Sequence, residues 1–387
     1  MIKKIFIYTF LMGMCLISLH SINAATITVN PGHSIQNAVN HASNGDTIIV
    51  NDNHKNPYTY KESITLNKKI NITANGKVTI EAKNTNSAVF TVNENGAGST
   101  IQKFSLTKSS YSIMINNANN CIIRYNNIIG ASLVGIQFYG DIDNTKVISN
   151  NISGTTPKQG NGISFEYGTS TNNNLTGNII RNFLNGILFN GNSSHNLISK
   201  NKVYSTGYHG AGIYATDNSR YMQITDNKIF GAEDGIAIQK IGSSTASHYL
   251  ISRNTVKSNK NGFWIRLTSS TISYNNATQN KVSGLDITGS HNKIVYNTAT
   301  GNGNCGITLG RFYSKDYNTV SYNTLTYNLA GINSQSHYTT ISNNYVCYNK
   351  NNGIISLANN TIITGNTITN TARRIITVGT NVSCQKQ

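Results

Sequence analysis

Five residues in the middle of the chain have the side chains that a sugar-binding surface requires. They are Tyr214, Gln239, Trp264, Arg266 and Asp286, and Trp264 is the only tryptophan of the protein. Aromatic rings stack on the apolar faces of sugars, while amide, guanidinium and carboxylate groups bond to hydroxyls or acidic substituents. These residue types favour saccharide binding, provided that a scaffold turns all five to one face.

A repeated phrase supplies that scaffold. It consists of an aliphatic residue, two spacers, Asn, one spacer and a second aliphatic residue, and its eleven asparagines are 21 to 28 residues apart. A second phrase, Gly followed by an aliphatic or aromatic residue, comes 8 to 12 residues after each of the first ten. A period near 22 residues indicates a solenoid, in which each repeat contacts only its neighbours. The asparagines are Asn126, Asn150, Asn178, Asn201, Asn227, Asn254, Asn275, Asn297, Asn323, Asn344 and Asn366.

The short apolar runs between these phrases predict strands. Each repeat holds three of them, separated by Asn, Gly and Ser, and helical periodicity is confined to the start of the chain. We therefore predict an all-β fold, a single-stranded right-handed parallel β-helix of about 22-residue coils, in which equivalent strands pair about 4.8 Å apart. A short helix over Ile35–Ala42, with Ser34 as its N-cap, is expected to cover the open end of the core.

The repeated asparagines themselves are expected to be structural. Asn tolerates left-handed backbone, and its amide can bond the Asn of the next coil, which satisfies polar groups inside the rod.

Alternation along the Gly-Ile strand predicts which residues face solvent. If the residue after Gly points inward, the second and fourth positions after Gly point outward. The five residues above occupy these positions, with Tyr214 and Trp264 two coils, or about 10 Å, apart. Long connections over 155–161, 206–211, 240–248 and 311–317 are expected to flank this sheet, and such insertions often carry function.

The first 24 residues are typical of a secretory signal. Lys3 and Lys4 precede the apolar run 5–19 and a small residue, Ala24, at the cleavage point. We divide the remainder into an N-terminal cap with the first strands (25–57), the β-helix (58–372) and a C-terminal tail (373–387). No later stretch resembles a transmembrane segment, so we expect a secreted or cell-surface protein.

The charge balance suggests an acidic partner. The whole chain carries a formal net charge of +17. Without Lys3 and Lys4 the mature chain keeps 29 basic and 14 acidic residues. A strongly positive exported protein is suited to acidic polysaccharide or another cell-wall polyanion, although general solubility is an equal explanation. No basic run interleaved with aromatics indicates nucleic acid. We expect a monomer.

The opening of the mature chain carries a family resemblance. Pro31-Gly32-His33-Ser34-Ile35-Gln36, Gly45-Asp46-Thr47 and Tyr60-Lys61-Glu62-Ser63-Ile64 resemble the opening of NosD-type and methanogen adhesin-like β-helix proteins. The chain as a whole is similar to the right-handed parallel β-helix, or pectin-lyase-like, superfamily. The resemblance implies a secreted or surface-attached protein. Some members bind carbohydrate, whereas others cleave or epimerise it.

An enzyme is the alternative to a binding protein. Outward acids are sparse, since Glu166 and Asp286 lie five coils apart, and glycoside hydrolysis needs two carboxyls within about 5–10 Å. The segment Gly231-Ala232-Glu233-Asp234-Gly235 resembles the paired-acid segment of polygalacturonases, but the partner motifs of neighbouring coils are missing. His209 lies nearby as a candidate base. A lyase, epimerase or hydrolase of uronate polymers stays open, and we assign no catalytic residue.

No cofactor or metal site is expected. The spacing of Cys121, Cys305, Cys347 and Cys384 fits neither a disulfide framework nor a metal site. The first three are interpreted as small buried hydrophobes, and the disulfide state stays open.

Overall fold

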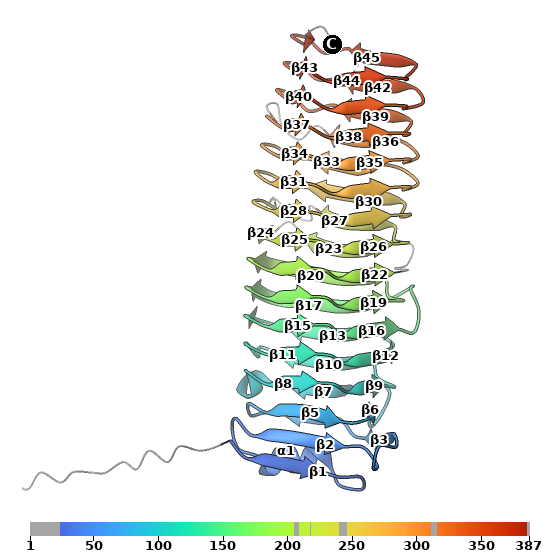
Figure 1. Ribbon diagram of the computed structural model, residues 1–387. Coiled ribbons are helices and arrows are strands. Elements are labelled where there is room, and N and C mark those ends of the chain that lie inside the picture. The colour runs from blue at the N-terminus through green and yellow to red at the C-terminus, as the bar shows by residue number, and fades with distance from the viewer. Residues whose placement is uncertain (1–23, 205–208, 217, 240–245, 311–315, 385–387) are drawn as a thin grey trace, which may run out of the picture.

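Short strands that end in sharp corners wind this chain into a rod. The structure is a computed structural model that describes residues 24–204, 209–216, 218–239, 246–310 and 316–384. The coils stack from the N-terminus to the C-terminus, and each coil between the first and the last contributes a strand to each of three parallel sheets (Figure 1). The predicted right-handed parallel β-helix is confirmed. The predicted signal over residues 1–24 lies almost wholly outside the described residues, and no helix among those described is long and apolar enough to cross a membrane.

Sheet I holds the strands that lead into the repeated asparagines. Within the described residues it has 16 strands in this order: β1 (Thr26–Val29), β2 (Thr47–Asn51), β5 (Asn71–Asn75), β8 (Thr100–Gln102), β11 (Ile122–Arg124), β15 (Lys146–Ile148), β18 (Asn174–Thr176), β21 (Leu197–Ser199), β25 (Gln223–Thr225), β28 (Leu250–Ser252), β31 (Thr271–Ser273), β34 (Lys293–Val295), β37 (Thr319–Ser321), β40 (Thr340–Ser342), β43 (Ile362–Thr364) and β46 (Ser383–Cys384).

Sheet II follows each asparagine. Its 14 strands in the described part of the chain are β3 (Tyr58–Lys61), β6 (Val78–Glu81), β9 (Ser105–Thr107), β12 (Asn127–Ala131), β16 (Asn151–Gly154), β19 (Ile179–Arg181), β22 (Lys202–Tyr204), β26 (Lys228–Phe230), β29 (Thr255–Lys257), β32 (Asn276–Thr278), β35 (Thr298–Thr300), β38 (Thr324–Thr326), β41 (Tyr345–Cys347) and β44 (Thr367–Thr369).

Sheet III carries the Gly-Ile phrase. Its main path, as far as the structure describes it, is β4 (Ile64–Leu66), β7 (Ala88–Val92), β10 (Tyr111–Asn116), β13 (Val134–Tyr139), β17 (Asn161–Thr171), β20 (Asn185–Ser194), β23 (Ala211–Thr216), β27 (Asp234–Gln239), β30 (Asn261–Arg266), β33 (Leu285–Thr288), β36 (Cys305–Gly310), β39 (Ala330–Ser334), β42 (Asn352–Ser356) and β45 (Arg373–Thr377). Two short strands, β14 (Ile142–Asp143) and β24 (Ser219–Arg220), pair with β17 and β20 beside this path.

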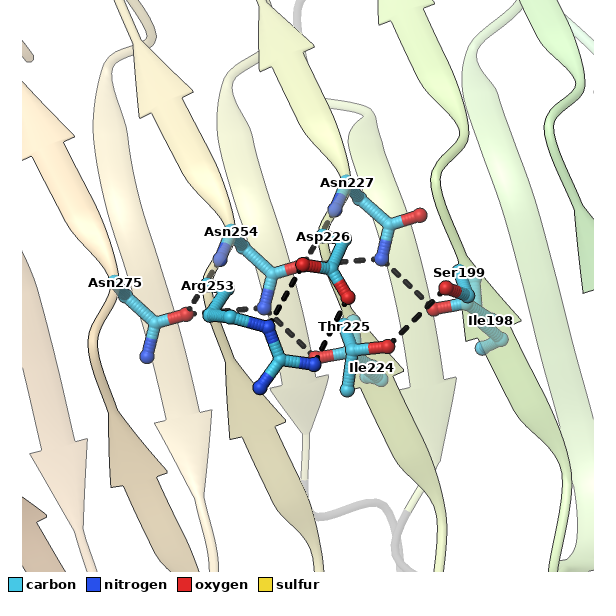
Figure 2. Close-up of polar contacts among 9 residues, drawn as sticks. All are labelled: Ile198, Ser199, Ile224, Thr225, Asp226, Asn227, Arg253, Asn254 and Asn275. Atoms are coloured by element: carbon cyan, nitrogen blue, oxygen red, sulfur yellow. Dashed lines mark hydrogen bonds and ion pairs between the residues drawn. The ribbon is translucent and has the colours of Figure 1, made fainter.

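The corner between sheets I and II is held by the repeated asparagines. Asn254 shows the pattern, which Figure 2 draws: its Oδ1 accepts from the backbone N and the Nδ2 of Asn227, both at 3.0 Å, and its Nδ2 donates to Asn275 Oδ1 at 3.0 Å. The same Nδ2 also donates to the carbonyl of Ile224 at 2.8 Å. The residue before each Asn turns the chain, as in Arg253 with a φ of 56°. All eleven asparagines are buried, so their predicted structural role is confirmed.

Two further asparagine ladders occupy the other corners, and the sequence pattern did not reveal them. Between sheets II and III a ladder runs through Asn259, Asn280, Asn302, Asn328 and Asn349. Between sheets III and I, Asn173 bonds Asn196, and the backbone N of Asn292 bonds the Asn318 side chain. Buried polar groups at the corners are thus paired with equivalent groups one coil on.

The glycine of the Gly-Ile phrase recurs at the same place in each coil for a steric reason. A Cβ added to Gly235 would lie 2.0 Å from Val256 Cγ1 and 2.5 Å from the carbonyl oxygen of Gly262. The strand therefore enters sheet III too close to the core for any side chain. The residues after Gly fill the interior, where Phe138, Phe165 and Phe189 stack with ring centroids 4.3 and 4.5 Å apart.

A helix closes the N-terminal end, as predicted. The helix α1 (Ile35–His41) buries Ile35 and Val39, and its N-cap Ser34 accepts from Asn37 N at 3.1 Å. It ends one residue before the predicted boundary, because Ala42 has extended backbone.

The segment that carries the family resemblance clamps this helix. The carboxylate of Glu62 accepts from Ser34 Oγ at 2.8 Å and from the backbone N of Ile35 and Gln36 at 2.8 and 3.0 Å. The Gln36 side chain in turn accepts from Thr65 N at 2.7 Å. The two halves of the opening motif therefore bond to each other.

At the other end, the described residues of the predicted tail continue the ladder. Strand β45 pairs with β42, and β46 pairs with β43.

The ladder predicts a large difference between two neighbouring asparagines. Asn275 is buried and makes its ladder bonds, whereas Asn276 is exposed on β32. Asn275→Ala is expected to lower the free energy of unfolding by about 1–3 kcal/mol, because the polar groups of the adjacent coils lose their partners. Asn276→Ala is the matched control and is expected to change little. Chemical denaturation of both variants measures the difference, and equal stabilities would contradict the structural role of the ladder.

Candidate functional site

The five predicted binding residues lie on the outer face of sheet III. In register, Tyr214 of β23 pairs with Ala237 of β27, Ala237 with Trp264 of β30, and Trp264 with Asp286 of β33. Gln239 pairs with Thr216, and Arg266 with Thr288, in the next outward position. The residues after Gly in these strands are fully buried, which confirms the predicted alternation.

The two aromatic residues flank a small residue. Ala237 has no exposed surface and lies one coil from both Tyr214 and Trp264, which places the two aromatic residues about 10 Å apart along the rod. Trp264 is 36% exposed. The Tyr214 hydroxyl donates to Gln239 Oε1 at 3.2 Å, which links two of the predicted residues directly. We call Tyr214, Gln239, Trp264, Arg266 and Asp286 the aromatic column.

The column contains an acid whose charge is disfavoured. Partial burial raises the pKa of Asp286, the charge of Arg266 opposes this, and the charge of Asp234 adds to it. Arg266 itself is exposed.

Asp234 is a second acid on this face, and the sequence analysis missed it as an outward residue. It is only 7% exposed, accepts from Asn261 Nδ2 at 2.8 Å, and begins β27. Burial raises its pKa, and the nearby Glu233 charge contributes, while Asn261 and Lys260 oppose the shift. Counting back by two from Ala237 gives Gly235 and not Asp234 as the next outward position, so alternation along the sequence does not reveal Asp234.

Beside these acids lies an ion-pair cluster formed by three successive coils, at the starts of β23, β27 and β30. Lys260 Nζ is 2.7 Å from Glu233 Oε1, and His209 Nδ1 is 3.3 Å from Glu233 Oε2. The backbone N of His209 also donates to Glu233. Burial opposes the ionised form of Glu233, but the donors of Lys260 and His209 outweigh it and lower its pKa. His209, the candidate base, is therefore held by a carboxylate.

The long connections flank this sheet as expected. The connections over 155–161 and 206–211 join sheet II to sheet III, and those over 240–248 and 311–317 join sheet III to sheet I. Parts of the last three lie outside the described residues.

The cysteines show no bridge among the described residues. Cys121, Cys305 and Cys347 are buried and free, as interpreted, and Cys384 is exposed and free.

The stacked coils and the outward column define the protein as a parallel β-helix protein, and two family comparisons agree. The family described as periplasmic copper-binding protein (NosD) matches residues 7–234 and 154–307, and the right-handed β-helix region family matches 238–386. The chain belongs to the NosD family.

Solved structures are similar in fold. The receptor-binding domain of the siphovirus 9NA tailspike is 12% identical, with a TM-score of 0.59 over 93% of this chain and 76% of the domain. The Dettilon tailspike protein is 13% identical, with a TM-score of 0.50 over 88% of this chain and 68% of its own. A periplasmic alginate epimerase is 17% identical, over 81% of this chain and 78% of its own, with a TM-score of 0.38. No curated protein matches the sequence significantly.

The copper in the family description does not fit the residues that the structure describes. Copper prefers imidazole, thiolate and thioether ligands grouped around one point. Among the described residues, no group of three or more His, Cys, Asp or Glu side chains comes close enough to hold a metal ion. The buried thiols of Cys121, Cys305 and Cys347 lie in separate coils. We therefore derive no chemistry through copper.

The raised pKa of Asp234 predicts a stability effect with a definite pH dependence. Its contribution to stability is fully present below the unfolded-state pKa, near 3.8, and is lost as the pH rises through the folded-state pKa. Asp234→Asn keeps an acceptor for Asn261 and carries no charge. The variant is expected to be more stable than the wild type at pH 7, with a difference that vanishes near pH 4 and below.

Thermal denaturation across this pH range measures the effect. Asp226→Asn is the control, because hydrogen bonding to Arg253 lowers the pKa of Asp226. Its replacement is expected to cost stability at pH 7 and less at low pH. If Asp234→Asn lowered the stability at pH 7, the raised pKa of Asp234 would be refuted.

Proposed function

We propose that the protein is a secreted or cell-surface β-helix that binds polysaccharide along the aromatic column, in the manner of an adhesin. The observation that carries the proposal is the exposed Trp264, two coils from Tyr214 on one straight sheet face. Stacking on a sugar buries the exposed face of an aromatic ring, which stabilises the complex. The coil spacing separates the two rings by a distance suited to successive sugars of a polymer. The related tailspike domain is described as receptor-binding, which is compatible with such a role on this fold.

An acidic polysaccharide is the preferred partner. The chain carries a formal net charge of +17, and Arg266 is the exposed cation within the column. A guanidinium can bind a sugar carboxylate with two parallel hydrogen bonds. Gln239 and Asp286, whose carboxyl group is held toward its neutral form, supply contacts for hydroxyls. The long-range positive charge would favour encounter with a polyanion, most strongly at low salt.

The column predicts a fluorescence response to binding. Because Trp264 is the only tryptophan, binding of alginate or pectate oligosaccharides is expected to change the emission of the protein. Trp264→Ala is expected to weaken binding about tenfold, through loss of about 1–2 kcal/mol of stacking, and Trp264→Phe less. Tyr322→Ala serves as the control, because Tyr322 is also exposed but lies at a corner of the rod, outside the aromatic column. Unchanged affinity in Trp264→Ala, measured by calorimetry, would remove the column from the binding site.

A polysaccharide-modifying enzyme is the second candidate, favoured by the two hindered acids. Asp234 and Asp286 lie on the same face as the aromatic column, and both have raised pKa values. A raised pKa favours the protonated form of a carboxyl, and it is the protonated form that can act as a general acid toward a glycosidic oxygen.

Product analysis distinguishes the two candidates. Incubation with alginate, pectate and glycosaminoglycans is expected to yield unsaturated uronates for a lyase, new reducing ends for a hydrolase, or changed uronate NMR signals for an epimerase. An enzyme of any of these kinds should lose its activity in Asp286→Asn. No product with any polymer, together with retained binding, would exclude the enzyme on these substrates.

A further inference from the structure

A cavity lies on the same sheet nearer the N-terminus, away from the aromatic column. It has a volume of about 510 Å³ and is lined by Tyr111, Met114, Asn116, Asn117, Gln137, Tyr139, Glu166 and Tyr167. These residues come from β10, β13 and β17 and the residue after β10, in the part of the rod coloured teal and green (Figure 1). The volume lies in the range of about 300–1000 Å³ that is usual for small-ligand sites.

Strand register determines the shape of the cavity. Met114 of β10 pairs with Gln137 of β13, and these two lie in the middle of the strands. Tyr111 begins β10, while Tyr139 ends β13 next to Glu166 of β17. The cavity thus has a thioether and an amide in its centre and aromatic rings at both ends.

The aromatic rings are unusually open to solvent. Tyr139 is 49% exposed and Tyr167 71% exposed, and their ring centroids are 5.2 Å apart at an interplanar angle of 37°. The tilt leaves ring surface directed away from the ring pair. Such surface can contact the apolar face of a sugar or a cation.

The charge of the cavity is opposite to that of the protein. Glu166 is the one charged residue among the eight that line it, in a chain of net charge +17. Ser164 Oγ donates to Glu166 Oε1 at 2.5 Å, and Asn161 Nδ2 makes a long contact of 3.5 Å with the same oxygen. Among the described residues no donor bonds to Oε2. The serine orients the carboxylate and leaves one oxygen for a ligand.

The amides of the cavity retain bonding capacity for hydroxyl groups. Gln137 Nε2 donates to Phe138 O at 2.9 Å, and Asn116 Nδ2 donates to Asn93 Oδ1 at 3.2 Å. Asn117 Oδ1 accepts from Asp141 N at 2.9 Å. These bonds use one N–H of each of the first two amides and the oxygen of the third. They orient the carbonyl oxygens of Gln137 and Asn116 and the NH₂ group of Asn117 as bonding groups for a ligand.

We propose that this cavity binds a sugar unit that carries a free ammonium group, namely a hexosamine without its N-acetyl group. The ammonium lies against Glu166 Oε2 and the faces of Tyr139 and Tyr167. The sugar ring packs on Met114 and the tyrosines, and its hydroxyls bond the free amide groups. This site is separate from the aromatic column in residues and in ligand charge, so it stands or fails independently of the proposed function.

A matched pair of oligosaccharides tests the proposal on the full mature chain. Calorimetry at about pH 5.5 compares the glucosamine tetramer with the N-acetylglucosamine tetramer. The two differ only in the acyl group that removes the positive charge. The wild type is expected to bind the amine form at least about tenfold more tightly.

Two variants assign the effect to the cavity, and two more serve as controls. Glu166→Gln keeps an acceptor for Ser164 and is expected to lose about tenfold in affinity for the amine tetramer, with little change for the acetylated one. Tyr167→Ala, at an exposed position, is expected to weaken binding of both. Glu94→Gln, at an exposed acid elsewhere, and Trp264→Ala are expected to have no effect.

Several outcomes would overturn the proposal. They are no binding of the amine tetramer, equal binding of the two tetramers, and an unchanged preference in Glu166→Gln. Circular dichroism of each variant checks that a loss of binding is not a loss of fold. If Trp264→Ala weakened binding of the amine tetramer as much as Glu166→Gln does, the tetramer would be bound at the aromatic column instead.

Discussion

The structure depends on the pairing of buried polar groups at the corners of its coils. A chain that turns three times in about 22 residues brings backbone amides and carbonyls inside the rod where water cannot reach them. The asparagine side chain solves this problem with one amide: Oδ1 accepts two bonds from the coil before, and Nδ2 donates to the coil after and to a backbone carbonyl. Each bond satisfies a group whose burial would otherwise cost about 1–3 kcal/mol. The ladder thereby fixes the register of all three sheets.

Much of this was readable from the sequence, because the ladder leaves a periodic trace. The eleven asparagines, the glycines that admit no Cβ and the helix N-cap Ser34 each reflect a local constraint that only one or a few residue types meet. Outward positions then followed from alternation, and the five residues of the aromatic column lie on one face as predicted. The other ladders escaped notice because they cover fewer coils, so that no long period marks them.

The parts that could not be predicted depend on side-chain packing. Asp234 lies before the glycine from which outward positions were counted, and its burial results from neighbours in two coils. The cavity beside Tyr139 and Tyr167 lies next to a register shift between Glu166 and Thr169, where the long strand β17 departs from regular pairing with β20. Neither a ring tilt nor a hydrogen bond that orients Glu166 leaves a trace in residue spacing.

The segment that marks the family has a structural explanation, and this limits what family membership implies. Glu62 binds the first turn of α1, and the residues around it hold the cap onto the first coils. These contacts hold the cap of this chain and involve none of the outward positions of sheet III, so the motif carries no information on what those positions bind. Function must therefore be sought where the scaffold leaves choice, at outward positions of sheet III. There the chain presents a cation, Arg266, in one place and a carboxylate, Glu166, in another. Because coil spacing is constant, the sequence alone sets the distance between two such sites, and a β-helix can add or change one without disturbing the other.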